Sequence, residues 1–489
     1  MSVVGSKEVR CGFSSARRAA EAVLVLIVVA MLASSAAFAG TTSSAPATET
    51  SSDASSGHLK RVLASTVHAV LVANFDAPDL QSHLIGYSVA KTGQLVQLPA
   101  ASGQPETGTD EEFEDVVLAP SNKFAYATDV YRDVIWGFNV TFTSTTRKLT
   151  PMPALEPFFL NNTDCPDEAV VSTSGVLYVS DDCNGNIDAF SINAKTGALT
   201  PLTGSPFAGG SCLDEMALNA AGTLLYASDE CDRDVVEFSV GTSGSLTLLG
   251  RTNGGGGTDN VNNFRGSPRG LTVDPSGSYV YVTDPNRGAL MEFKIEPSSG
   301  GGTSACTTGS SNTTPGCLNF IGLNSDNLSA PTDVKAEASG HYVYAADGEG
   351  DVLAEFSIEP TSGTGTALCT SGSANTTPGC LNTIGAQQVP HFDSASPECP
   401  FRLAVSGTLL YSTDPCQNMV LQDTINLSGA TTCLQNGNPE AVNAPGCLSA
   451  IGTGEIADPL DGPSGLAILD PPAGKRHRRR HRHDRHAER

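Results

Sequence analysis

The sequence predicts an all-β protein, a seven-bladed β-propeller with four short antiparallel strands in each blade. Two observations predict this fold. A strand motif that usually carries tyrosine occurs seven times, and a strand motif near the end of the chain supplies what the first copy lacks. The composition agrees, since 50 Gly, 29 Pro and only 6% aromatic residues are typical of many turns and short strands.

The repeated motif is a hydrophobic strand that ends in Asp or Asn. Its terminal residues lie 55, 52, 48, 55, 63 and 67 positions apart, so one supersecondary unit is copied. We interpret the terminal Asp or Asn as a turn cap, because its side chain accepts hydrogen bonds from the backbone that follows. The copies end at Asn74, Asp129, Asp181, Asp229, Asp284, Asp347 and Asp414.

Each copy is predicted to form four strands. In the fifth copy, residues 270–273 predict a first strand, residues 275–277 a turn, and the tyrosine strand follows. A Gly-containing turn such as the one at Gly197 then separates a third strand from a fourth. Immunoglobulin-like domains are the alternative, but each needs about 100 residues. The third strands carry the aromatic residues Tyr87, Phe138, Phe190, Phe238, Phe293 and Phe356.

The two ends of the repeat array complement each other. The first copy begins directly at residues 68–74, without a first strand before it. Residues 463–468 repeat a first strand and then stop at Pro471 and Pro472. We therefore expect the C-terminal strand to complete the first blade, which closes the ring and removes its exposed edges.

The remaining segments predict an exported protein. Residues 1–39 have the order of a Sec-type signal peptide, with Arg17 and Arg18 before an apolar run and small residues around Phe38. An uncleaved membrane anchor is the alternative. Residues 40–57 form a Ser/Thr-rich linker, residues 58–472 the propeller, and residues 473–489 a basic His/Arg-rich tail that we expect to be disordered. The expected location is extracellular or associated with the cell wall.

The cysteines agree with export. Twelve of the 13 follow the signal segment and fall into six local pairs, which favours disulfides in an oxidising compartment. Metal-binding thiols are the alternative, but no Cys-x-x-Cys occurs. Three pairs bracket the first two strands of a repeat, and three close loops between a third and a fourth strand. The pairs are Cys165/Cys183, Cys212/Cys231, Cys399/Cys416, Cys306/Cys317, Cys369/Cys380 and Cys433/Cys447.

Charge is segregated along the chain. Without the signal segment and the tail, 16 basic and 48 acidic residues remain, a net charge of −32. A body this acidic is a poor candidate for binding nucleic acid or an anionic membrane. The tail from Lys475 onward is either solvated, or it contacts polyanions, folds back on the acidic body, or binds metal through its histidines.

Residues 268–284, PRGLTVDPSGSYVYVTD, resemble the YVTN-type repeats of seven-bladed lactonase-like propellers. That family includes 6-phosphogluconolactonases and carboxymuconate-cyclising relatives. The resemblance covers roughly residues 60–472. It implies the propeller fold and, if the chain is an enzyme, a lactonase-type hydrolase. We expect a monomer. Export argues against 6-phosphogluconolactone itself, because that compound is a cytosolic metabolite.

No short catalytic signature occurs in the sequence, so candidate site residues come from comparing the repeats. Residues shared by all copies are interpreted as architectural, and departures at one matched position are candidates for function. The start of the first strand is the informative position, because in a propeller it lines the mouth of the central channel. The matched residues are Asp115, Glu168, Glu215, Gly270, Asp333, Arg402 and Gly465, and Glu114, Asp214 and Arg269 adjoin them.

Four carboxylates and one arginine therefore converge on a small ring. Carboxylates this close raise one another's pKa or bind a cation, and Ca²⁺ at Asp115, Glu168, Glu215 and Asp333 is the expected metal. No other cofactor is expected. The catalytic candidates are Glu168, Glu215, Arg402 and His391. The carboxymuconate-type relatives use a channel histidine, and here only His391 would reach that mouth. Asp115, Asp333 and Arg269 are candidates for ligand binding.

Three functions stay open from the sequence. The first is hydrolysis of a lactone or related small acid at the acidic mouth. The second is a non-catalytic scaffold that binds a protein, glycan or cell-wall ligand on the disulfide-stapled face, with Phe158 and Phe159 among its exposed apolar groups. In the third, the carboxylates are merely hydrated and serve solubility.

Overall fold

The structure is a computed structural model of the 489-residue chain. The chain divides into two compact units, Met1–Gly57 and His58–Arg489, and every described residue lies in the second. These residues form strands and no helix, so none belongs to a helix long and apolar enough to cross a membrane. The described ranges are 69–74, 84–89, 95–97, 113–130, 132–142, 147–151, 158–160, 165–254, 263–389, 400–427, 432–435, 438–443, 445–450 and 463–469.

The strands form seven antiparallel four-stranded sheets, numbered here as blades 1 to 7. Blade 1 contains β32 (Pro463–Leu469), β1 (Ala69–Asn74), β2 (Ile85–Val89) and β3 (Leu95–Gln97). Blade 2 contains β4 (Phe113–Leu118), β5 (Phe124–Asp129), β6 (Val134–Phe142) and β7 (Arg147–Pro151), and blade 3 contains β9 (Pro166–Val171), β10 (Val176–Asp181), β11 (Asn186–Ile192) and β12 (Leu199–Pro201). Short strands β8 (Phe158–Phe159) and β13 (Phe207–Ala208) pair with β6 and β11.

The other four blades follow the same order. Blade 4 contains β14 (Leu213–Leu218), β15 (Leu224–Asp229), β16 (Asp234–Val240) and β17 (Leu246–Thr252), and blade 5 contains β18 (Leu271–Val273), β19 (Tyr279–Asp284), β20 (Ala289–Ile295) and β21 (Leu318–Asn324). Blade 6 contains β22 (Pro331–Ala336), β23 (Tyr342–Asp347), β24 (Val352–Ile358) and β25 (Leu381–Gln388). Blade 7 contains β26 (Leu403–Ser406), β27 (Leu409–Asp414), β28 (Met419–Asn426) and β31 (Cys447–Ala450), with a hairpin of β29 (Thr432–Gln435) and β30 (Asn438–Asn443) before β31.

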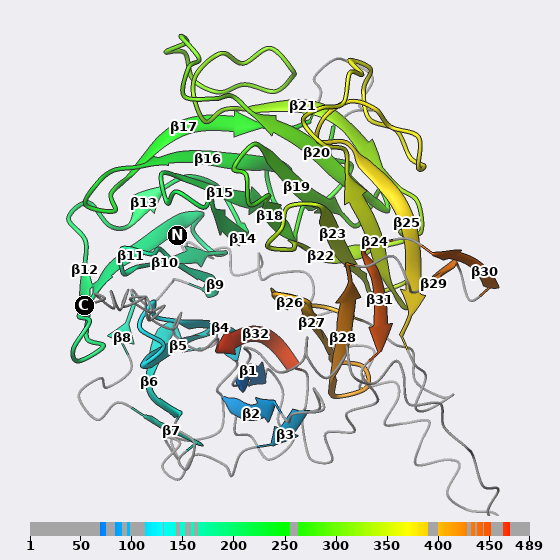
Figure 1. The fold of residues 1–489 in the computed structure, drawn as a ribbon. Coiled ribbons are helices and arrows are strands. Elements are labelled where there is room, and N and C mark those ends of the chain that lie inside the picture. Colours follow the sequence, from blue (N-terminus) through cyan, green and yellow to red (C-terminus); the bar gives the residue numbers. More distant parts are fainter. Residues whose placement is uncertain are drawn as a thin grey trace, which may run out of the picture. The chain divides into compact units, whose positions relative to one another are not determined.

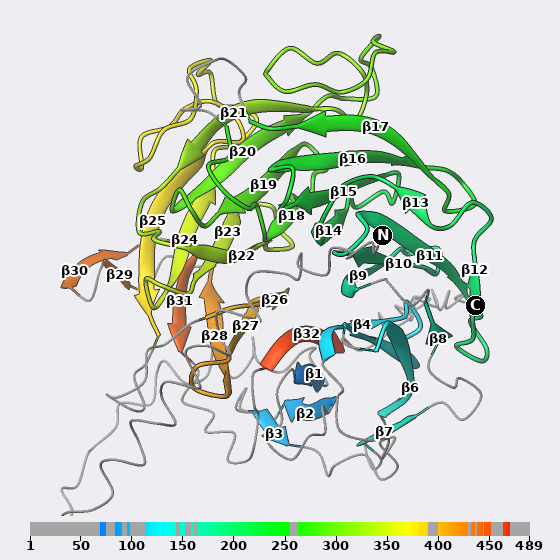
Figure 2. The ribbon, with the colours of Figure 1, turned by 180° about the vertical axis from the view of Figure 1, so that it is seen from behind.

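The sheets form a ring in which each first strand contacts the first strand of the next blade. These contacts run from β32 through β4, β9, β14, β18, β22 and β26 and return to β32. Figure 1 shows β9, β14, β18 and β22 on the inner side of their sheets and β17, β21 and β25 on the outer side, and Figure 2 shows the same order from behind. The predicted seven-bladed propeller is confirmed.

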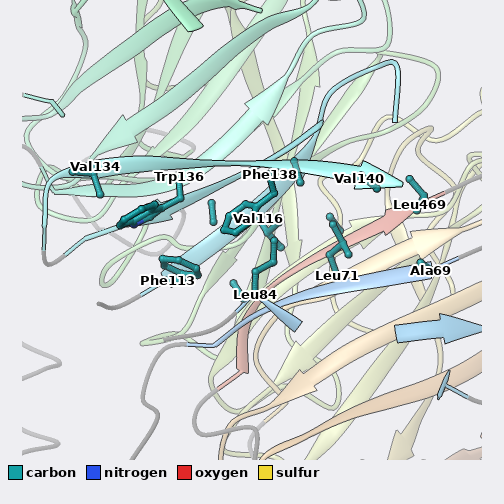
Figure 3. Close-up of a cluster of buried hydrophobic side chains, with 14 residues drawn as sticks. Ala69, Leu71, Leu84, Phe113, Val116, Val134, Trp136, Phe138, Val140 and Leu469 are labelled. Atoms are coloured by element: carbon teal, nitrogen blue, oxygen red, sulfur yellow. The ribbon is translucent and has the colours of Figure 1, made fainter. Parts of the chain in front are cut away.

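Ring closure by the C-terminal strand is also confirmed. Strand β32 pairs antiparallel with β1, with Leu469 opposite Ala69 and Leu466 opposite Val72. Leu469 and Leu71 of blade 1 pack in one hydrophobic cluster with Phe113 and Phe138 of blade 2, as Figure 3 shows. The last strand of the chain therefore completes blade 1 and helps to join it to blade 2.

The hydrophobic core lies between the blades. Seven clusters of buried side chains each combine residues of two successive blades, including blade 7 with blade 1. The repeated tyrosine strengthens these interfaces, because its buried hydroxyl donates to a glycine carbonyl of the next blade. The pairs are Tyr126–Gly197, Tyr178–Gly244, Tyr226–Gly316, Tyr281–Gly379 and Tyr344–Gly446, with O–O distances of 2.7–2.8 Å.

The terminal Asp of the motif caps turns, as predicted. In blade 4, Asp229 Oδ1 accepts hydrogen bonds from the backbone of Cys231 and Asp232 in the turn after β15. The same carboxylate accepts bonds from Ser211 and Cys212 in the loop before β14. One fully buried Asp thus ties the start of the first strand to the end of the second.

Four of the six predicted disulfides are confirmed: Cys165–Cys183, Cys212–Cys231, Cys306–Cys317 and Cys369–Cys380. Cys416 and Cys447 are also disulfide-bonded. Their expected partners are Cys399, which lies outside the described residues, and Cys433, of which only the backbone is described. Phe158 differs from the expectation of an exposed apolar group, because it packs edge-to-face on Phe190 with ring centroids 4.8 Å apart.

Removing β32 should abolish folding. A chain that ends at Asp461 loses the ladder to β1, the buried Leu469 and the partly buried Leu466 and Ile468, at up to roughly 2 kcal/mol for each large side chain. That loss is comparable to the whole stability of a typical domain, about 5–15 kcal/mol. We expect insoluble or unfolded protein by circular dichroism. A chain that ends at Pro472 keeps β32 and should melt like the full chain, and equal melting of both truncations would contradict closure.

Candidate functional site

The matched residues at the start of the first strands occupy one structural position. Each stands beside the residue that precedes the terminal Asp or Asn of the second strand, where five ladders have a bulge. In four blades a hydroxyl at that neighbouring position accepts the backbone N–H of the matched residue and holds it in place. The pairs are Asp115–Thr128, Glu168–Ser180, Glu215–Ser228 and Arg402–Thr413, at 3.0–3.1 Å.

Arg402 is the centre of the site. Its Nη1 donates to Glu215 Oε2 at 2.9 Å, and its Nη2 lies 3.4 Å from Glu168 Oε2 and 3.7 Å from Asp214 Oδ1. Although burial opposes the charged form, Glu168 and Glu215 raise the pKa of Arg402 well above its usual range. One nearly buried guanidinium from blade 7 therefore binds carboxylates of blades 3 and 4.

Lys335 is a second cation, which the comparison of matched positions missed. It lies on β22 two residues after Asp333, and its ammonium contacts Glu215 Oε1 and lies 2.9 Å from Asp333 Oδ1. Burial acts to lower the pKa of Lys335, but the charges of Asp333 and Glu215 raise it above its usual range. The signal was present in the sequence, because residues i and i+2 of a strand point to the same face.

Glu215 is thus fixed between two cations, while Glu168 is less constrained. The Oε2 atom of Glu168 is buried and has no hydrogen-bond partner within the described part of the chain. Burial, followed by the charge of Asp115, raises the pKa of Glu168 to about 8, although Arg402 opposes this shift. Its side chain keeps 12% of its surface exposed, so Glu168 can exchange a proton with solvent near neutral pH.

Asp115 and Asp333 have a different role, because each bonds to the backbone of the next blade. Asp115 Oδ2 accepts the N–H of Ala169 at 3.2 Å, and Asp333 Oδ2 accepts the N–H of Leu403 at 2.7 Å. Burial raises the pKa of Asp115 to about 7, with Arg402 opposing the shift. These two carboxylates join blade 2 to blade 3 and blade 6 to blade 7.

The two matched glycines make room for these aspartates. A Cβ on Gly465 would lie 2.5 Å from the Cα of Asp115, and a Cβ on Gly270 would lie 2.4 Å from the Cα of Asp333. Any side chain there would push the next blade away. The glycines at these two matched positions therefore have a steric, structural cause.

A second acidic group adjoins the ring. Asp214 forms side-chain hydrogen bonds with Asp167 and Glu230, and Arg269 Nε lies 2.7 Å from Glu230 Oε1. Burial and then the charge of Asp214 raise the pKa of Asp167 well above its usual range and that of Glu230 to about 8. Burial acts to raise the pKa of Asp214, but Arg402 and Arg269 lower it. Two carboxylic acids therefore donate to one carboxylate.

Of the predicted site residues, Glu168, Glu215, Asp333 and Arg402 are brought together, and Asp115 acts on them through its charge. Arg269 belongs instead to the adjoining acidic group. His391 lies outside the described residues. Glu215 and Asp333 already have Lys335 as a counter-charge, and the calcium site at these carboxylates stays a prediction.

The fold and the site together define a class of protein. Its members are seven-bladed propellers with a cluster of carboxylates and an arginine at the start of the first strands. The family model for lactonases, described as "Lactonase, 7-bladed beta-propeller", matches residues 50–320, more than half of the chain. The chain belongs to this lactonase propeller family.

Solved structures agree on the fold. A putative 6-phosphogluconolactonase from Bacteroides fragilis is 16% identical, with a TM-score of 0.56 over 83% of this chain and 99% of that one. A protein from Lactobacillus plantarum is 13% identical, with a TM-score of 0.59 over 82% and 99% of the two chains. The periplasmic gluconolactonase of Pseudomonas aeruginosa is 14% identical, with a TM-score of 0.52 over 83% and 99%. No curated protein sequence matches this chain.

The buried acids predict that the protein is less stable at high pH. Burial raises the pKa of Glu168, Glu237 and Glu355 to about 8 and that of Asp115 to about 7. The native state therefore keeps protons that the unfolded chain releases above its ordinary carboxyl pKa. Their contribution to the free energy of unfolding is complete below the ordinary carboxyl pKa and is lost as the pH rises to about 8.

We expect the melting temperature to fall steadily between pH 5 and pH 9 in thermal scans by circular dichroism. The Glu237→Gln variant has one such acid fewer and should show a shallower slope. A melting temperature that rises over this range would contradict the assignment of protonated buried carboxyls.

Proposed function

We propose that the protein hydrolyses a lactone at the cluster of Glu168, Glu215 and Arg402. One observation carries the proposal: Glu168 Oε2 and Arg402 Nε are buried atoms that lack a hydrogen-bond partner among the described residues, and the two side chains meet only in the 3.4 Å contact between Glu168 Oε2 and Arg402 Nη2. Unpaired polar groups of this kind are costly in a fold and are typical of sites that bind a polar ligand. Membership of the lactonase propeller family supports the same reaction.

The geometry suggests a division of labour. Arg402 donates to the lactone carbonyl oxygen and stabilises the negative charge that develops there. Glu168 accepts a proton from water as the water oxygen bonds to the carbonyl carbon. The ring C–O bond then breaks, and Glu168 returns the proton to the alkoxide that leaves. Glu215, held by Arg402 and Lys335, is a positioning residue that fixes the guanidinium.

Export is part of the proposal. The four described disulfides support an oxidising compartment, because such bonds are rare in the cytosol. A structurally similar protein is a periplasmic gluconolactonase. We propose a secreted monomer whose basic tail contacts polyanions such as those of a cell wall.

Variants of the cluster test the proposed reaction. Glu168→Gln removes the base and should lower kcat at least about 100-fold, the usual scale for a general base. Arg402→Lys should lower kcat by a similar factor, because an ammonium does not reproduce the guanidinium geometry. Wild-type kcat/KM should rise with pH to a plateau above about pH 8, where Glu168 is ionised. Rates are measured on a lactone panel and corrected for spontaneous hydrolysis.

The matched control is Glu349→Gln, which changes an exposed glutamate of blade 6 and should leave turnover unchanged. Folding of every variant is checked by circular dichroism. If Glu168→Gln and Arg402→Lys both turn over like the wild type, hydrolysis at this cluster is wrong. If no lactone is hydrolysed by the wild type, the scaffold function that the sequence left open is favoured instead.

The charges of the site predict an uncharged substrate. Its described cations, Arg402, Lys335 and Arg269, each contact a carboxylate, so no surplus positive charge faces a phosphate. A phosphate dianion would also be repelled by the remaining carboxylates. We expect kcat/KM to be at least about tenfold higher for glucono-δ-lactone than for 6-phosphogluconolactone, a discrimination of about 1.4 kcal/mol. A preference for the phosphorylated lactone would contradict this reading while leaving lactone hydrolysis intact.

A further inference from the structure

Three blades carry a buried glutamate in the middle of their third strand. Glu237, Glu292 and Glu355 stand opposite the repeated tyrosines of blades 4, 5 and 6 and are at most 1% exposed. At the same position blades 1, 2, 3 and 7 have Gly86, Gly137, Ala189 and Gln422. The glutamate occurs only where the next blade has a paired-cysteine loop between its third and fourth strands. We call these loops the cysteine flaps.

Each glutamate holds the flap of the next blade. Glu292 Oε2 accepts the backbone N–H of Leu381 at 3.0 Å, and Glu355 Oε1 accepts that of Leu448 at 2.8 Å. Glu237 bonds equivalently to Leu318 and also accepts the hydroxyl of Thr252 at 2.5 Å. The three leucines directly follow the second cysteine of their flaps. One carboxylate oxygen of each glutamate therefore has a hydrogen-bond partner.

The second oxygen is left without a partner. Glu237 Oε2, Glu292 Oε1 and Glu355 Oε2 are buried and accept no hydrogen bond from the described residues. Burying a polar group without a partner costs free energy, so its retention in three blades calls for a ligand.

Sulfur atoms surround these carboxyls. One oxygen of Glu237 and the Sγ atoms of Cys306 and Cys317 all lie within 4.8 Å of one another. The same holds for Glu292 with Cys369 and Cys380. All six side chains are at least 95% buried. In the structure the two sulfurs of each group are joined in a disulfide. Once reduced, two thiolate sulfurs and one carboxylate oxygen are a donor set that suits Zn²⁺, with water in the fourth position.

We propose that the Glu237–Cys306–Cys317 and Glu292–Cys369–Cys380 triads are latent sites for Zn²⁺ or a similar thiophilic divalent cation, which open when the disulfides are reduced. A thiol or phosphine reductant supplies two electrons, the S–S bond breaks, and each sulfur takes up a proton. A thiol reductant is oxidised to its disulfide, and a phosphine is oxidised to its oxide with the oxygen and the two protons coming from one water molecule. The cation then displaces the two thiol protons and the carboxyl proton. Ca²⁺ is not expected to bind, because it prefers oxygen ligands.

The sites lie where the flaps dock on the preceding blade. Cys306 forms a parallel bridge with Gly250 at the end of β17, and Cys369 forms one with Gly322 in β21. A Cβ on either glycine would lie 2.4 Å from the cysteine carbonyl oxygen, so the flap backbone sits directly on the outer strand. A cation held by the glutamate of one blade and the cysteines of the next would keep this docking after the disulfide opens.

Metal analysis of the reduced protein tests the proposal. The full chain is reduced with a phosphine, incubated with Zn²⁺ or Co²⁺, and desalted, and bound metal is counted by mass spectrometry. We expect the oxidised protein to keep no metal in the triads and the reduced protein to keep two equivalents more than the double variant Glu237→Gln/Glu292→Gln. With Co²⁺, a thiolate charge-transfer band should appear in the near ultraviolet and weaken in that variant.

The double variant is the sharpest comparison, because glutamine still accepts the flap N–H but is a poor ligand. Its Zn²⁺ affinity should fall roughly tenfold or more, whereas the Glu349→Gln control should bind like the wild type. Metal captured by an unfolded reduced chain would not depend on Glu237 or Glu292. Equal retention by the double variant and the wild type, or no retention by the reduced wild type, would overturn the proposal.

Discussion

Contact between successive blades is the constraint on which the structure depends. Each sheet buries its faces against its two neighbours, and seven hydrophobic clusters lie at the seven interfaces. An arrangement of this kind is stable only when the ring is closed, because an open ring leaves two apolar faces in water. The pairing of β32 with β1 meets that condition with one seven-residue strand.

Contact between blades also decides which of the seven matched positions at the start of the first strands are available for catalysis. At two of the seven interfaces a glycine lets an aspartate of the next blade approach, and that aspartate then bonds to the blade beyond. Gly465 with Asp115 and Gly270 with Asp333 are the two cases. Four of the seven matched positions are therefore used to hold the ring. Glu168, Glu215 and Arg402 remain, and these three form the cluster to which we assign function.

The fold could be predicted from the sequence because each repeat marks where its strands end, so that the copies can be aligned with one another. Asp229 and its equivalents mark strand ends, and comparing copies placed Glu168, Glu215 and Arg402 at one structural position. The sequence could not predict what each carboxylate does, because hydrogen bonds such as that from Leu403 to Asp333 cross between residues far apart in the chain. Lys335 was missed for a related reason. It lies outside the matched position, although its strand points it to the same face.

Compensation of charge explains why a group of buried acids this large is tolerated. Arg402 and Lys335 neutralise Glu215 and Asp333, while Asp167 and Glu230 share protons with Asp214. The third-strand glutamates use another solution, since burial keeps the carboxyl of Glu237 protonated and neutral. Each solution leaves atoms without a hydrogen-bond partner among the described residues, at Glu168 and Arg402 in the ring and at Glu237, Glu292 and Glu355 beside the flaps. Because the fold gains nothing from these unpaired atoms, they are the places where a ligand would add most to its stability.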